Sequence, residues 1–68
     1  MNEPYHIHLI RTGQPDLCIA QVPADVPGAY TIAEDIARGQ SHNGKCHMLD
    51  EEGVRASFTG GRRNPDMS

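Results

Sequence analysis

The sequence predicts a small α+β domain of order ββαββ, in which an antiparallel sheet packs one helix on one face. Two apolar segments near the N-terminus have strand character, a short middle segment has helical spacing, and a hairpin pattern closes the chain. With 68 residues, the chain is long enough for one domain. We assign residues 1–60 to this domain and residues 61–68 to a flexible C-terminal tail.

The first two predicted strands form a hairpin. Residues 5–11 start as a clean alternation in which apolar side chains take one face and histidines the other. Residues 12–16 have turn chemistry, and residues 17–22 form a second apolar run too short to favour a helix. The pattern does not decide which side of this second strand faces the core: either Leu17, Ile19 and Gln21, or Cys18, Ala20 and Val22.

A short helix is predicted over residues 31–38, after an irregular connection at residues 23–28 that contains two prolines. Thr31 and Glu34 have the spacing of a capping box at its start, and Gly39 is the expected C-terminal cap. The expected apolar face of this helix consists of Ile32, Ala33, Ile36 and Ala37.

The closing hairpin is predicted from residues 45–49 and 54–59, joined by residues 50–53 with Gly53 in a left-handed conformation. On its second strand, one face is expected to carry Val54, Ala56 and Phe58, and the other Arg55, Ser57 and Thr59.

Composition excludes several classes of protein. The formal net charge of −3 argues against a general nucleic-acid binder, which needs a basic surface to displace counterions. Two cysteines are too few for a secreted disulfide scaffold, and no apolar run approaches the ~20 residues of a membrane helix. We therefore expect a cytoplasmic protein with reduced thiols. The few large apolar residues predict a thin core that is either marginally stable or gains stability from a partner.

Histidine and cysteine supply the most suggestive chemistry. A zinc site would need three or four of the residues His6, His8, His42, Cys46 and His47 to converge, but the usual ligand spacings of zinc fingers are absent. We therefore assign no metal ligand or cofactor. A small metal-binding or redox protein using these residues is kept as an alternative function.

No catalytic constellation is recognisable. Cys46 and His47 are adjacent on a predicted strand, so their side chains point apart. Gly60 and Gly61 lack the strand–loop–helix context of a phosphate loop. We expect no enzyme and assign no catalytic residue.

The leading expectation is a protein-binding module that occupies a surface of a larger protein or ribonucleoprotein complex, with a homodimer as another possibility. Acidic side chains at the second hairpin turn and on the helix would complement a basic surface. The uncovered sheet face, with Ile10, Ser57 and Thr59 among its expected members, would supply a mixed contact patch. The predicted partner-binding residues are His6, His8, Glu34, Asp35, Asp50, Glu51, Glu52 and Arg55. A further alternative is a nucleic-acid accessory protein using this face and Arg62–Arg63; no membrane contact is expected.

The order of elements resembles that of small anti-CRISPR proteins encoded by phages and other mobile elements. The resemblance rests on the strand at residues 5–11, the helix at residues 31–38 and the hairpin at residues 46–58. It implies a non-enzymatic inhibitor that binds a CRISPR surveillance complex or nuclease and obstructs its nucleic-acid site. These proteins share no motif, so no functional residue is carried over from them.

Overall fold

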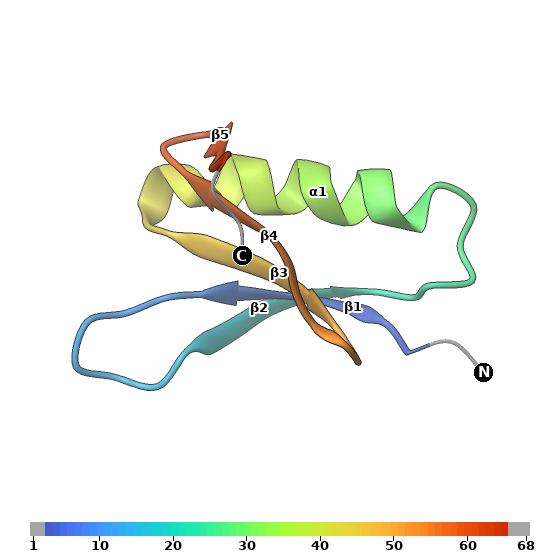
Figure 1. Ribbon diagram of the computed structural model, residues 1–68, viewed down its shortest axis with the longest axis horizontal. Helices are drawn as coiled ribbons and strands as arrows, with labels where there is room; N and C mark the ends of the chain where they lie inside the picture. Colours follow the sequence, from blue (N-terminus) through green and yellow to red (C-terminus); the bar gives the residue numbers. More distant parts are fainter. Residues whose placement is uncertain (1–2, 66–68) are drawn as a thin grey trace.

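The computed structural model, which describes residues 3–65, confirms the α+β class and a single antiparallel sheet with one helix on one face. Its strands lie side by side in the order β2-β1-β3-β4-β5, and α1 runs across them (Figure 1). The elements are β1 (Tyr5–Leu9), β2 (Leu17–Val22), α1 (Ala29–Gln40), the 3₁₀ helix η1 (Ser41–Asn43), β3 (Cys46–Asp50), β4 (Gly53–Thr59) and β5 (Arg62–Arg63). Among the described residues, no helix is long and apolar enough to cross a membrane.

The core lies between α1 and the sheet. Ala29, Ala33 and Ala37 recur every four residues on the helix, so they share one face, and all three are buried. Their small side chains let the helix lie close to the strands. The buried strand residues opposite them are Ile7, Val22, Cys46, Met48, Ala56 and Phe58.

The helix begins earlier and ends later than predicted. Gly28 precedes it with φ +73°, a left-handed conformation that suits glycine, and the amide of Ile32 donates to the Gly28 carbonyl at 3.0 Å. The predicted capping box is wrong, because Thr31 lies inside the first turn and no side chain caps this end. Gly39 is also not the cap, since α1 continues to Gln40 and passes directly into η1.

One predicted member of the apolar helix face is misplaced. Ile32 is 41% exposed, whereas Ile36 packs against the core as a half-buried side chain. The buried stripe instead starts at Ala29, one turn before Ala33. The helix is rotated so that the row of Ala29, Ala33 and Ala37 faces the sheet, and this rotation leaves Ile32 outside the buried face.

A β-bulge decides which side chains of β2 face the helix. Ile7 pairs with Ala20, but the next residue, His8, pairs with Cys18, so Ile19 is the extra residue. Neither inward face proposed for this strand holds along its whole length. Cys18 is exposed, while Ile19, Ala20 and Val22 all pack in or against the core.

A second bulge changes the closing hairpin. Met48 pairs with Ala56 but Leu49 pairs with Val54, which leaves Arg55 as the extra residue. The prediction that Val54 shares a face with Ala56 and Phe58 is therefore wrong: Val54 is 41% exposed, and the other two are fully buried. The turn itself consists of Glu51 and Glu52, and Gly53 has the expected positive φ, +113°.

The chain after β4 folds back against it. β5 pairs with the end of β4, Phe58 with Arg63 and Thr59 with Arg62, within the segment predicted as a tail. Its return turn is fastened to the end of the helix by Ser41, whose backbone carbonyl accepts a hydrogen bond from Gly60 at 2.9 Å. The last predicted tail residues, 66–68, lie outside the described residues.

Candidate functional site: a histidine and cysteine cluster on the open sheet face

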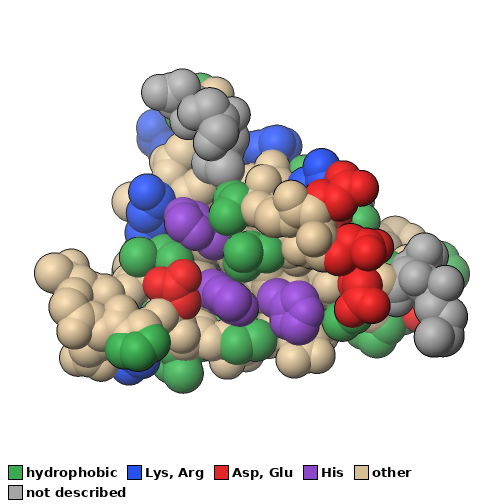
Figure 2. Space-filling model, turned by 60° about the horizontal axis from the view of Figure 1, so that its bottom comes forward, with side chains coloured by type: hydrophobic (Ala, Val, Ile, Leu, Met, Phe, Trp, Pro, Cys, Tyr) green, Lys and Arg blue, Asp and Glu red, His purple; other side chains and the backbone are tan. Residues whose placement is uncertain are grey.

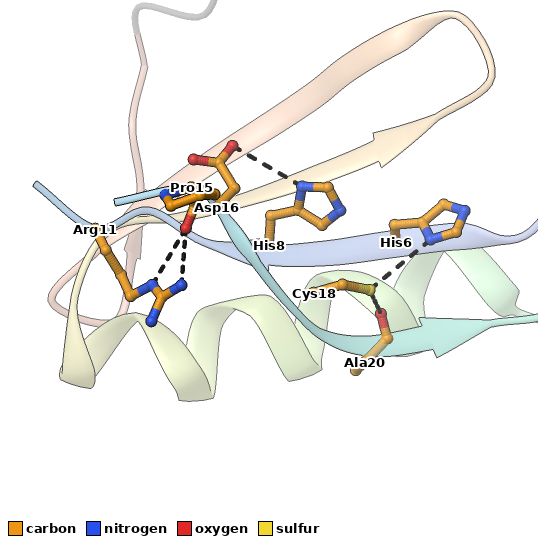
Figure 3. A network of polar contacts seen from close by, with 7 residues as sticks. All are labelled: His6, His8, Arg11, Pro15, Asp16, Cys18 and Ala20. Atoms are coloured by element: carbon orange, nitrogen blue, oxygen red, sulfur yellow. Dashed lines mark hydrogen bonds and ion pairs between the residues drawn. The ribbon is translucent and has the colours of Figure 1, made fainter. Parts of the chain in front are cut away.

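The sheet face opposite α1 carries a cluster of His6, His8 and Cys18, whose potential ligand atoms all lie within 4.8 Å of one another. His6 and His8 alternate with the buried Ile7 on β1, so both point away from the helix. The bulge places Cys18 directly across from His8. Its Sγ lies 3.9 Å from Nδ1 of His6 (Figure 3).

Two neighbours give this cluster its electrostatic setting. A carboxylate oxygen of Asp16, just before β2, lies 3.9 Å from Nδ1 of His8 (Figure 3). His47 on β3 pairs with His8 from the other side. Partial burial lowers the pKa of His47, with further lowering from Lys45 and His8 and an opposing effect of Asp16. His47 therefore favours its neutral form.

The face around the cluster is apolar in part and acidic at its end. Figure 2 shows histidine side chains gathered across it, with hydrophobic side chains beside them and acidic side chains at the margin. Leu49 pairs with His6 on one side and Val54 on the other, so Val54 belongs to this face. We call this surface, formed by His6, His8, Cys18, His47, Leu49 and Val54, the open face.

The β3–β4 turn is a rigid acidic corner next to the open face. Arg55 donates to Asp50 at 2.7 Å and also to Glu52, and the amide of Glu52 donates to Asp50 at 2.8 Å. The hydrogen bond from Arg55, followed by that from the Glu52 amide, lowers the pKa of Asp50. Glu51 is exposed beside them. Two carboxylates thus bind one guanidinium, and with the exposed Glu51 the corner keeps a net negative charge.

The structure brings together six of the eight predicted partner-binding residues and separates two. The two histidines lie on the open face, and Asp50, Glu51, Glu52 and Arg55 lie at its acidic corner. Glu34 and Asp35 lie on α1, on the other side of the sheet. Glu34 accepts a hydrogen bond from Arg63 at 3.3 Å, so one arginine of the basic pair in the nucleic-acid alternative contacts the helix.

The candidate metal ligands named from the sequence differ from the residues that lie close together in the structure. Cys46 lies fully buried on the helix side, where burial raises the pKa of its thiol, and His42 lies in η1 beside Gly61. Cys18, which was not among those candidates, is the cysteine that joins His6 and His8. The only feature of the sequence that pointed to Cys18 was the predicted hairpin, which brings residues 6–8 and 17–22 together. It does not determine which side chains of residues 17–22 lie on the same sheet face as the histidines.

The geometry of the cluster fits coordination better than catalysis. A cysteine nucleophile needs a base within hydrogen-bond reach and a third group that orients the base. Cys18 lies 3.9 Å from Nδ1 of His6, within reach for sulfur, but among the described residues no third group hydrogen-bonds to the His6 ring to orient it. A pocket elsewhere on the described chain is lined by Glu3, Tyr5, Ala24, Asp50 and Glu51, which include no histidine or cysteine.

The fold and the cluster define a small α+β domain with one helix-covered sheet face and one open face rich in histidine. Comparisons of the chain with protein-family models, with curated proteins and with solved structures found no match.

Proposed function

We propose that this protein is a non-enzymatic binding module whose open face and acidic corner dock onto a basic, partly apolar surface of a larger protein. The observation that carries the proposal is the one-sided sheet: α1 covers one face, while Val54 is 41% exposed on the other and stands next to Leu49. Apolar side chains flanked by polar and charged groups have the composition of an interface centre and its rim.

Charge complementarity selects a basic partner. The net charge is −3, and the acidic corner contains three carboxylates, of which those of Asp50 and Glu52 bind Arg55. Because Arg55 holds Asp50 and Glu52 in place, these carboxylates are presented without further ordering. Charges of this kind raise the association rate and determine which partners bind.

The finer proposal is that the partner is a nucleic-acid-handling complex of the CRISPR type and that the module inhibits it. Surfaces that bind phosphates are basic, and fixed carboxylates can occupy the positions of phosphates on them. The element order, which resembles that of anti-CRISPR proteins, supports the same proposal.

The test measures binding of the purified chain to a panel of immobilised RNA-guided surveillance complexes and nucleases, with and without target DNA. We expect binding that competes with the DNA and weakens with added salt. Val54→Arg should weaken it about tenfold or more, since a charge at an interface centre costs at least about 1.4 kcal/mol. Glu51→Lys with Glu52→Lys should slow association.

Asp35→Lys is the matched control, because Asp35 is an exposed carboxylate on the helix side. Its binding should equal that of the unmodified chain. Binding that is lost in this variant but retained in Val54→Arg would show that the helix side docks and would contradict the proposed face. A panel in which no complex binds would refute the CRISPR-type partner.

A further inference from the structure

We propose that His6, His8 and Cys18 form a zinc-binding site on the open face, with Asp16 as the positioning residue for His8. This site does not depend on the docking proposal, although it lies on the same surface.

The distances favour closure around one ion. Zinc bonds of about 2.0–2.1 Å to nitrogen and about 2.3 Å to sulfur in a tetrahedron place ligand atoms about 3.4–3.7 Å apart. Here the three ligand atoms lie within 4.8 Å of one another, and the sulfur is 3.9 Å from Nδ1 of His6. Side-chain rotations can supply the remaining shift without moving the strands.

The sheet fixes the three side chains on one face. His6 and His8 are two residues apart on β1, which has a hydrogen-bonded strand on each side. Cys18 is held opposite His8 by the bulge. An unbulged hairpin would place Ile19 opposite His8 and turn Cys18 toward the helix. The site therefore needs this irregularity in the ladder.

The donor atoms select the metal. Two imidazole nitrogens and a thiolate sulfur suit zinc, whereas magnesium and calcium require oxygen ligands. Binding exchanges the thiol proton of Cys18 for a sulfur–zinc bond, and the proton passes to solvent. Three protein ligands leave a fourth position, which on this open face is accessible to water or to a ligand from another molecule.

Asp16 completes a common arrangement around histidine ligands. Its carboxylate lies 3.9 Å from Nδ1 of His8, longer than a hydrogen bond (Figure 3). In the metal-bound site we propose that the two groups close to hydrogen-bond distance, which leaves Nε2 of that ring for the metal. A carboxylate that accepts the Nδ1 proton fixes the tautomer and the ring orientation of the ligand. His47, although paired with His8, is not among the three residues whose ligand atoms converge.

The experiment titrates the reduced chain with zinc by calorimetry, counts bound ions by native mass spectrometry and repeats the titration with cobalt(II). We expect one ion per chain, together with cobalt spectra showing tetrahedral ligand-field bands and a thiolate charge-transfer band. Cys18→Ala and His8→Gln should each weaken zinc binding by about a hundredfold or more. Asp16→Asn should weaken it by about 10–100-fold, the usual cost of losing a carboxylate that orients a metal-ligating histidine.

His42→Gln is the matched control, because His42 is an exposed histidine in η1, outside the cluster. It should bind zinc as the unmodified chain does. The site would be refuted by absence of saturable binding, by half an ion per chain, or by equal affinity in Cys18→Ala. Unchanged affinity in Asp16→Asn would refute the positioning role. Val54→Arg, which tests docking, should leave zinc affinity unchanged, so the two proposals fail separately.

Discussion

Replacement of Ser41 by alanine should destabilise the fold more than any other serine substitution among the described residues. Ser41 is 2% exposed and connects the end of the helix to the β4–β5 turn. Its hydroxyl donates to the carbonyl of Arg38 at 2.6 Å and accepts from the amide of Gly61 at 2.7 Å. Ser41→Ala removes both hydrogen bonds at once.

The magnitude follows from what is left behind. The Arg38 carbonyl keeps a hydrogen bond from the backbone amide of residue 41, so its loss costs about 0.5–1.5 kcal/mol. The Gly61 amide loses its acceptor, the Ser41 hydroxyl oxygen, and leaving a partly buried donor unsatisfied costs about 1–3 kcal/mol. The sum is about 1.5–4.5 kcal/mol, a large share of the roughly 3–10 kcal/mol expected for a chain of this length.

Urea unfolding followed by circular dichroism measures the effect. With a slope of about 1 kcal/mol per molar, the urea midpoint should fall by about 1.5 M or more. Ser57→Ala is the matched control: Ser57 is equally buried, but its hydroxyl accepts one bond, from Asn64 at 3.1 Å, and should cost about 1 kcal/mol. The reasoning is refuted if the two variants have equal midpoints.

Three further predictions concern reactivity and titration. Iodoacetamide should modify the exposed Cys18 of the native, metal-free chain and spare the buried Cys46, as mass spectrometry of the digested protein can show; equal labelling would contradict the burial. Since burial raises the folded-state pKa of Cys46, stability should be retained below the ordinary value of 9.0 and fall as the pH rises through the raised value, as urea midpoints across this range can test. Arg55→Ala should raise the pKa of Asp50 toward its ordinary 3.8, as an NMR titration can show. In the unmodified chain, the lowered pKa means that Asp50 contributes to folding stability above pH 3.8 and that this contribution is lost as the pH falls through the lower value. In Arg55→Ala, this loss of stability should occur at a higher pH.

Much of the architecture could be read from local patterns. Alternation in residues 5–9 and the apolar run of residues 17–22 gave strands that the structure contains, and the turn at residues 51–52 lies where the acidic residues and Gly53 predicted it. The helix was predicted, but its ends were not. Thr31 fits a capping-box pattern, whereas the helix begins two residues earlier, after Gly28 in its left-handed conformation.

The candidate site could be predicted only in part. The alternation placed His6 and His8 on one face, and the turn placed Asp50, Glu51 and Glu52 at one corner. Which cysteine joins the histidines could not be predicted, because a strand shows its period but not its register with a partner.

Short-range periodicity and turn chemistry predict the fold class, the helix, four of the five strands and the polar character of one sheet face. The tertiary structure alone decided the two bulges, which bring Cys18 to His8 and Val54 to Leu49. The physical reason is that a single extra residue reverses the side-chain alternation of everything beyond it in a ladder. The position of each bulge in its strand depends on how the whole sheet packs against the alanine face of the helix.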